Sequence, residues 1–499
     1  MFGLTGWLTL VAFSVAEYPS IIRNTCYFQT SWLLCSASLD AFQRAIVILS
    51  LSFAFGCLAA SGFFVWRSFL KSEIIENKKI IGFIASLIIL ASLVVPFSST
   101  DINFYFAAGR ATADGVNVFM VDWPKDNNFV WPVTRSRTER FSYAPIMAYV
   151  FAGVYKISGE NMIKFIVLWK ILNVLTTLAC GYLLYNFLQP TLFSKYRLLL
   201  VWLAQPLVLF EWISVGHFDS FWLLFILFAL IFVKNRRWWL VLPCITIGIW
   251  LKFVPFFFIP WFGLKWWGSL NKENWKKLLG QMVLGGLLSV LITYLSWFKF
   301  WTGFGVFTLL GAMSKLAAGS VFSVVYYTLE PLAKILLGAN FHWYLTRFVH
   351  LALLVTIFYF VYPLVKKMLK VICKREDWSD TEFTAALFIL FFSSLALWQK
   401  AIFPWYLNWI LPFGIITLVK FRNKYLERVA IWSSFTSLFS YVAWIFYRFT
   451  TGLDAGLSLW FFWFMFLTIF AYPIYNFFRW RRENYKLDQV DDGAQIVKI

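Results

Sequence analysis

The sequence predicts an all-α protein that crosses a membrane several times. The 499-residue chain is 61% hydrophobic and 22% aromatic but only 14% charged, whereas about a quarter of the residues of a soluble protein are charged. Apolar runs long enough to span a bilayer recur along the chain and are separated by short polar links. Lys and Arg gather in those links, so the net charge of +20 reflects membrane topology and does not point to nucleic-acid binding.

Apolar runs predict helices along the whole chain. They lie near residues 4–17, 44–68, 80–98, 163–187, 197–213, 220–233, 238–251, 253–264, 279–298, 345–364, 382–397, 404–419, 429–447 and 458–478. The clearest cytoplasmic links are the basic segments 71–79, 234–237, 265–277, 365–377, 420–428 and 479–486. Several runs are short for a full crossing, because about 20 apolar residues are needed to span a bilayer.

The basic links also predict which segments face outward. Because 71–79 and 234–237 are both cytoplasmic, counting the crossings between them leaves 99–162 wholly external. The apolar stretch 143–157 is then expected to be an amphipathic or re-entrant helix at the outer interface and not a simple crossing.

The same counting places 299–344 outside, with its apolar part 304–337 re-entrant or folded as a hairpin. The C-terminal tail, KLDQVDDGAQIVKI, is expected to be cytoplasmic and disordered. The predicted units are N-terminal membrane helices (1–79), a membrane core with its external loop (80–298), the external segment 299–344, C-terminal membrane helices (345–478) and a cytoplasmic tail (479–499).

Cysteine and histidine usage argues against a conventional metal centre. The six Cys residues show no metal-ligand spacing, and the chain has only three His residues. Cys26 and Cys35 share one predicted external segment, where a disulfide between them is an open alternative. No cofactor is predicted, and a divalent metal stays open although no ligand cluster is evident.

Asp101 is the first candidate for chemistry. It ends the third apolar stretch and begins a long polar stretch. A carboxylate at the mouth of a membrane helix is costly unless it has a partner or a function. The ordinary alternative is that Asp101 only caps or terminates a helix.

Other polar and aromatic groups collect on the same predicted outer side. Each has an ordinary explanation, such as a solvated loop face, a helix cap or a snorkelling lysine. Several cations outside nevertheless oppose the usual bias toward the cytoplasm, so a local reason is expected. The group comprises Tyr105, Arg110, Arg135, Arg137, Arg140, Tyr143, His217, Asp219, Lys252, Lys400, Trp405 and Tyr406.

A phosphate-bearing lipid is one reason that would account for these cations. Cations bind the phosphate and stabilise its charge as it leaves. A sugar on such a phosphate needs no general acid for departure, so one carboxylate base suffices to activate the incoming hydroxyl. Glycosidases differ, because they use two carboxylates.

Three patches carry a resemblance to a known family. They are SSTDINFYFAAGRATADGVNVF, AQPLVLFEWISVGHFDSFWLLFILFAL and GIWLKFVPFFFIPWF, with FPWYLNWILP as a weaker fourth. In this order they resemble polyprenol-phosphate-dependent glycosyltransferases of the GT-C superfamily, in the mannosyltransferase-like branch called glycosyltransferase family 87. The chain departs from the family pattern at Val118 and Phe119, where Pro-Tyr is usual, and at Phe218, where Asn is common.

The resemblance implies a GT-C-type helical bundle with juxtamembrane helices in its first large external loop. It implies inverting transfer of a hexose, most often mannose, from a polyprenyl-phosphate carrier on the extracytoplasmic side. The acceptor hydroxyl would belong to a glycan, a glycolipid or a protein. No nucleotide-binding loop is visible, which agrees with a lipid-linked donor.

The resemblance also assigns roles to the candidate residues. Asp101 becomes the base, and Asp219 orients His217 or binds a sugar hydroxyl. The aromatic groups expected to contact substrate are Tyr105, Tyr143, Trp405 and Tyr406. The cationic groups expected to hold the donor phosphate or sugar are Lys252, His217, Arg110, Arg135, Arg137, Arg140 and Lys400.

Two other classes remain as alternatives. A transporter or flippase of a polyprenol-linked sugar would use the same cations without a base, and a structural subunit of an envelope assembly would use neither. The sequence shows no chain of intramembrane acids and no obvious inverted repeat, which weakens the transporter interpretation.

Overall fold

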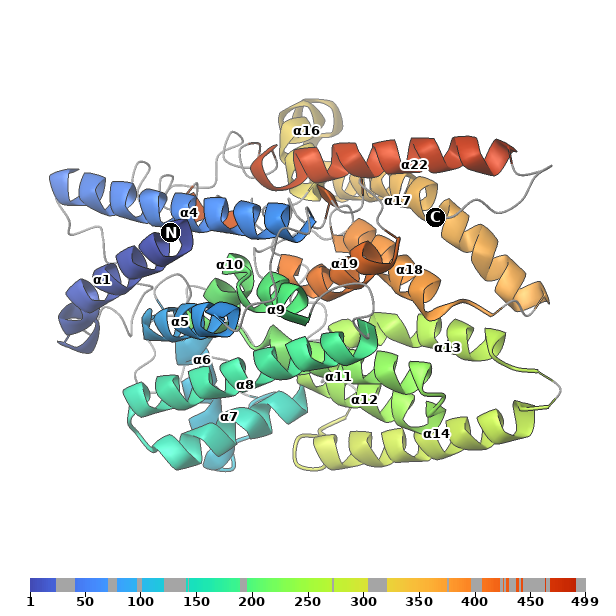
Figure 1. Cartoon of the computed structure of the whole chain (residues 1–499), viewed down its shortest axis with the longest axis horizontal. Coiled ribbons are helices and arrows are strands. Elements are labelled where there is room, and N and C mark those ends of the chain that lie inside the picture. The colour runs from blue at the N-terminus through green and yellow to red at the C-terminus, as the bar shows by residue number, and fades with distance from the viewer. Residues whose placement is uncertain are drawn as a thin grey trace.

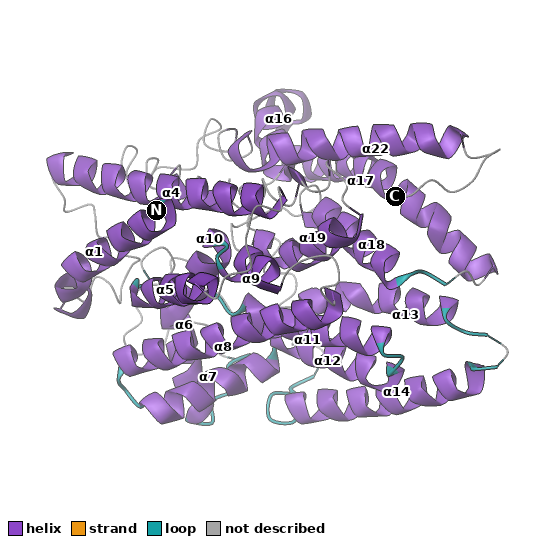
Figure 2. Cartoon of the chain, in the orientation of Figure 1, coloured by secondary structure: helices purple, strands orange, loops and turns teal. Residues whose placement is uncertain are grey.

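The computed structural model describes most of the chain. The described residues are 1–23, 41–70, 79–96, 101–120, 141, 143–188, 195–271, 273–303, 321–374, 377–395, 406–421 and 467–490, with a few single positions between 425 and 463. Within these ranges the chain forms helices and connecting loops without strands (Figure 2). The predicted all-α class is therefore confirmed.

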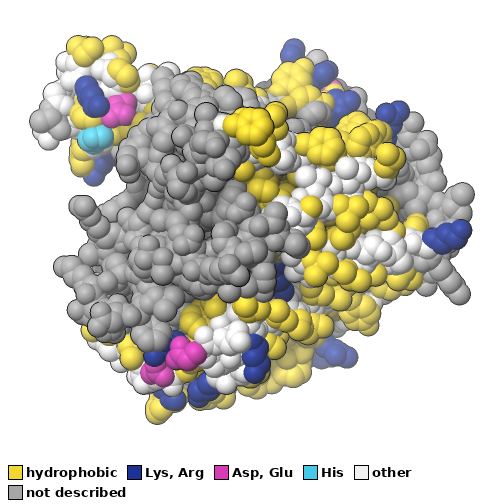
Figure 3. Space-filling model, turned by 90° about the vertical axis from the view of Figure 1, so that its left-hand side faces the viewer, with side chains coloured by type: hydrophobic (Ala, Val, Ile, Leu, Met, Phe, Trp, Pro, Cys, Tyr) yellow, Lys and Arg dark blue, Asp and Glu magenta, His cyan; other side chains and the backbone are white. Residues whose placement is uncertain are grey.

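Four helical segments are long and apolar enough to cross a membrane among the described residues: Ala45–Arg67, Met162–Leu188, Trp275–Trp297 and Phe341–Tyr362. A fifth candidate is a broken pair, Pro206–Ser214 with Asp219–Lys234. The surface agrees with a lipid environment, because Val167, Ile171 and Leu175 form an exposed stripe on one face of a candidate span. Figure 3 shows hydrophobic side chains covering much of the described surface on one side of the molecule. The protein is a polytopic membrane protein.

The first half builds two neighbouring groups of helices (Figure 1). The N-terminal group comprises α1 (Phe2–Arg23), α4 (Ala41–Leu70), α5 (Lys79–Leu93), α6 (Asp101–Ala113), α7 (Pro145–Ser158), α8 (Met162–Leu188) and α9 (Lys195–Leu203). The following group comprises α10 (Pro206–Val208), the π-helix η2 (Leu209–Ser214), α11 (Asp219–Lys234), η3 (Trp238–Leu240), α12 (Val241–Leu251), η4 (Val254–Phe258), α13 (Ile259–Gly268) and α14 (Trp275–Trp297).

The second half packs along the other side of the molecule (Figure 1). Here α16 projects from the body, while α18 and α19 lie against the central helices. The elements are α16 (Val321–Leu337), η7 (Gly338–Asn340), α17 (Phe341–Lys374), α18 (Asp380–Ser393), α19 (Leu407–Phe421), η10 (Leu467–Ala471) and α22 (Tyr472–Val490).

Several helix boundaries differ from the predicted ones. The residues that follow Asp101 were expected to form an external loop, but Asp101 is the first residue of α6, where the helix dipole favours an acid. The run 197–213 is broken before Pro206, because proline has no backbone N–H and restricts the residue before it. α17 continues to Lys374 and so includes most of the basic link 365–377.

The structure agrees with some of the other predicted segments and differs from others. α7 has 14 residues, too few for a crossing, which agrees with the prediction for 143–157. Of the stretch 304–337, the described residues 321–337 form one helix, α16, which shares a small apolar core with α17. The tail is helical through Val490 and not disordered from its start, because no Pro or Gly interrupts it before Gly493. The run 429–447 lies largely outside the described residues, and Cys26 and Cys35 lie wholly outside them. The run 458–478 is helical from Leu467, through η10 into α22.

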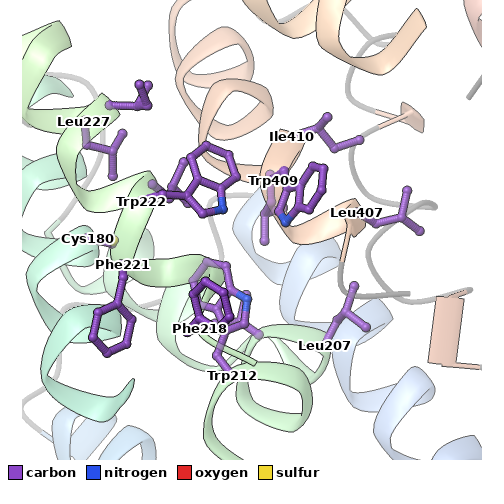
Figure 4. Close-up of a cluster of buried hydrophobic side chains, with 14 of the residues drawn as sticks. Cys180, Leu207, Trp212, Phe218, Phe221, Trp222, Leu227, Leu407, Trp409 and Ile410 are labelled. Atoms are coloured by element: carbon purple, nitrogen blue, oxygen red, sulfur yellow. The ribbon is translucent and has the colours of Figure 1, made fainter. Parts of the chain in front are cut away.

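A buried aromatic core joins the two halves. Trp222 of α11 and Trp409 of α19 meet edge to face, with ring centroids 5.6 Å apart. Figure 4 shows these two rings beside Phe218 and Trp212, with Leu407 and Ile410 of α19 close by. The second half therefore packs directly on the helices that carry the Gly-His-Phe-Asp motif.

A buried ionic contact joins the halves at another place. Lys265 of α13 is almost fully buried, and its Nζ lies 3.0 Å from Asp377 Oδ1 and 3.3 Å from Asp380 Oδ1. The same ammonium group also donates to the backbone carbonyl of Trp378. These bonds fasten the end of α13 to the start of α18.

Close packing of α6 on α7 depends on one glycine. A Cβ added at Gly109 would lie 2.5 Å from the carbonyl oxygen of Phe151, a backbone atom that cannot move aside cheaply. A Cβ added at Gly153 of α7 would meet nothing within 4 Å. Gly109 thus sets the separation of the two helices.

We expect Gly109→Ala to destabilise the protein by about 1–3 kcal/mol, since it overpacks the α6–α7 contact. Gly153→Ala is the matched control and should be neutral or stabilising by up to about 1 kcal/mol, because alanine is the better helix former. Thermal unfolding in detergent measures both. Equal unfolding temperatures for the two variants would contradict the packing argument.

Candidate functional site

The candidate site lies where η2 and α11 meet. Their two arms are bent by 119° about the break at Val215–Phe218. Gly216 permits this bend with φ +89, and its carbonyl accepts a 2.7 Å hydrogen bond from Trp169 Nε1. The link was predicted to be an external loop, but Val215 through Ser220 are all buried. The aromatic packing around the bend encloses it inside the bundle.

Asp101 reaches this break from the first turn of α6. Its Oδ2 accepts hydrogen bonds of 3.4 Å from the hydroxyls of Tyr105 and Tyr143. The same oxygen lies 3.4 Å from Nε2 of His217. Asp101 is 34% exposed while His217 is 3% exposed, so the carboxylate lies between a buried polar cluster and the solvent-accessible side.

Glu211 completes a chain of polar groups behind His217. It lies in the π-helix η2, is fully buried, and its Oε2 is 2.9 Å from His217 Nδ1. The hydroxyl of Tyr441 donates to the other carboxylate oxygen. Sequence analysis assigned no role to this buried acid. A lone acid in the apolar run 197–213 was the signal that could have revealed Glu211.

The two carboxylates face both ring nitrogens of His217, which lies in the break of the fifth candidate span. Burial disfavours a charged imidazole, whereas two carboxylates at these distances favour it. The arrangement is therefore suited to a cationic ring between two carboxylates.

A second buried pair lies beside this chain. Lys252 follows the last residue of α12, and its Nζ is 2.5 Å from Asp219 Oδ1. Trp222 Nε1 donates to the same oxygen at 3.2 Å. Asp219 was expected to orient His217 or bind a sugar hydroxyl. In the structure Glu211 contacts His217 Nδ1, and Asp219 contacts Lys252.

Aromatic rings surround the ammonium group of Lys252. Its Nζ lies 4.8 Å from the ring centroid of Trp409 and 5.5 Å from those of Phe218 and Tyr406. Such ring faces stabilise a cation that has lost part of its hydration. Tyr406 is thus brought to the site as expected, and Trp409 is an aromatic group that sequence reasoning missed.

Among the described residues, Arg110 is a predicted site residue that lies away from this cluster. Arg110 lies nine residues along α6 from Asp101, roughly 13 Å at 1.5 Å per residue. It pairs with Asp114 at 3.5 Å and Glu160 at 3.3 Å. The described residues include no group of three or more side chains able to hold a metal ion. Arg135, Arg137, Arg140, Lys400 and Trp405 lie outside the described residues.

The arrangement combines a partly exposed carboxylate with buried cations and aromatic faces. Asp101 can accept a proton, and the rings of Tyr406 and Trp409 are suited to stacking on a sugar or prenyl group. Fold and site together define a polytopic membrane protein whose polar cluster has the kinds of side chains found in active sites.

Comparison with known families gives the particular assignment. The family model described as "Alpha-(1->6)-mannopyranosyltransferase, N-terminal domain" matches residues 1–268, which is more than half of the chain. The chain therefore belongs to this family. Neither the search of curated proteins nor that of solved structures found a match. The resemblance to mannosyltransferases is confirmed, and the protein is a membrane glycosyltransferase.

We expect Lys252→Ala to destabilise the protein by about 3–5 kcal/mol, because it leaves Asp219 buried without its cation. The double variant Lys252→Ala with Asp219→Ala should recover much of that loss. Lys334→Ala, which removes an exposed pair with Glu330, is the control and should change stability by less than about 1 kcal/mol. Thermal unfolding in detergent measures the stability of each variant. A Lys252→Ala protein as stable as the wild type would contradict the pairing of Lys252 with Asp219.

Proposed function

We propose that the protein transfers mannose from a polyprenyl-phosphate carrier to an acceptor hydroxyl, with inversion and with Asp101 as the base. The observation that supports this most is the position of Asp101. It begins a helix, is held by Tyr105, Tyr143 and His217, and remains 34% exposed. The acceptor hydroxyl would come from a glycan, a glycolipid or a protein.

The proposed step needs only one protein base. Asp101 takes the proton of the acceptor hydroxyl while that oxygen forms a bond to the anomeric carbon of the sugar. The bond from that carbon to the phosphate oxygen breaks, and its electron pair leaves with the polyprenyl phosphate. Because phosphate is a good leaving group, no second carboxylate is needed as an acid.

Binding the donor phosphate requires a cation that can leave its present partner or come from another segment. Lys252 is paired with Asp219, and His217 lies between Asp101 and Glu211. In our proposal Lys252 turns its ammonium group from Asp219 toward the phosphate, and Tyr406 stacks on the donor. The cations of the external loop, Arg135, Arg137 and Arg140, together with Lys400 and Trp405, complete donor binding in the same proposal. Arg110 has no role in this proposal.

We expect Asp101→Asn to lower turnover by about 10²- to 10⁴-fold, the usual effect of losing a general base. Asparagine keeps the shape of the side chain but cannot take the proton. Asp114→Asn, an exposed acid of the same region, is the control and should keep most activity. The assay uses purified protein with polyprenyl-phosphate-mannose and a range of hydroxyl acceptors.

Normal turnover of Asp101→Asn together with its loss in Asp219→Asn would move the base to Asp219. A protein that moves the lipid-linked sugar across vesicles and tolerates Asp101→Asn would instead be a flippase.

The proposal places the Asp101 side of the molecule outside the cell membrane. In a background with the six native Cys residues replaced by Ser, we expect Met120→Cys and Ile157→Cys, at exposed positions, to react with an impermeant maleimide added to whole cells. Arg236→Cys, also at an exposed position, should react only after the membrane is opened. Reaction of Ile157→Cys and Arg236→Cys from the same side would contradict the counting of crossings.

A further inference from the structure

We propose that Glu211 is a positioning residue that holds His217 as a cation against Asp101, and that Tyr441 of the second half holds Glu211 in turn. The proposal rests on the proposed function, because it assigns Glu211 a role in the same transfer. Glu211 itself is fully buried behind His217 and so acts through the imidazole.

The contacts form a continuous line from the exposed carboxylate into the core. Asp101 Oδ2 is 3.4 Å from His217 Nε2, and His217 Nδ1 is 2.9 Å from Glu211 Oε2. The hydroxyl of Tyr441 donates to Glu211 Oε1. Each carboxylate therefore contacts a different nitrogen of one ring, and this fixes the ring plane as well as its charge.

Backbone geometry supports the same arrangement. The carbonyl of Glu211 accepts a 2.9 Å hydrogen bond from the backbone N–H of His217. Six residues separate the two, and the π-helical turn of η2 lets both their main chains and their side chains meet. π-helical turns of this kind are frequent at functional sites.

The charges alternate along this line, and several polar groups among the described residues face it. Tyr105 and Tyr143 donate to Asp101, Tyr441 donates to Glu211, and the Asp219–Lys252 pair lies alongside. When a donor phosphate enters, its negative charge favours protonation of Asp101, which would disable the base. A cationic His217 opposes this effect, and Glu211 is the counter-charge that keeps a buried imidazole protonated.

Through Tyr441, the position of Glu211 depends on the second half of the chain. The family match ends at residue 268, and Tyr441 lies 230 residues from Glu211 in sequence. Its ring is also fixed by stacking on Phe55 of α4, with centroids 5.3 Å apart. The alignment of His217 therefore draws on residues beyond the matched region.

The experiment combines an NMR titration with pH–rate profiles. The chain has three His residues, so ¹⁵N-histidine labelling in a His342→Gln/His350→Gln background isolates the His217 signal. We expect the wild-type ring to be protonated at neutral pH, because a carboxylate faces each of its nitrogens. Glu211→Gln should lower the pKa of His217 by about 1 to 3 and move the alkaline fall of kcat down by the same amount.

Turnover at neutral pH should also drop in Glu211→Gln, roughly 10- to 100-fold, by analogy with removing the hydrogen-bond partner behind a metal-bound histidine. The KM for the donor should stay within about twofold, because Glu211 touches no substrate. Tyr441→Phe should change both readouts in the same direction and less. Glu160→Gln, at an exposed acid that pairs with Arg110, is the control and should change neither.

The outcomes separate the two proposals. An unchanged His217 titration in Glu211→Gln overturns the inference, and so does a lowered pKa with an unchanged pH–rate profile. A wild-type enzyme without turnover overturns the proposed function and with it the role of Glu211 in the transfer. In that case the His217 titration alone tests whether Glu211 keeps His217 protonated.

Discussion

Charges buried inside this membrane protein must be matched by partners, and this constraint explains most of the structure around the site. Asp219 is paired with Lys252, and His217 lies between Asp101 and Glu211. An unpaired charge at such depth costs several kcal/mol, so the helices that supply the partners must be in place together. The bend at Gly216, the π-turn of η2 and the aromatic walls around Lys252 all serve this matching.

Much of the fold could be predicted from hydropathy, because the spacing of apolar runs and basic links is a local property. The broken run 197–213 could have been anticipated from Pro206 alone. The helix that begins at Asp101 was harder to predict, because its sequence DINFYFAAGRATA has a weak apolar face and packs through Gly109. Such packing depends on α7, which follows a long stretch of chain.

Part of the candidate site was predictable, because its sequence motifs are also local patterns. Motif order suggested that Asp101, His217, Asp219 and Lys252 belong together, and the structure brings all four into one cluster. The pairing within the cluster was not predictable. Glu211 appears in the sequence as one acid in an apolar run, and its partner Tyr441 lies 230 residues away. Long-range partners of this kind leave no local pattern.

The contact between Lys265 and the start of α18 has a consequence for biogenesis. Membrane helices enter the bilayer in the order of synthesis, and Asp377 is made 112 residues after Lys265. Until Asp377 and Asp380 arrive, the newly made first half has a lysine at this position without its carboxylates. The two halves can therefore close at this end of α13 only after the start of α18 has been made.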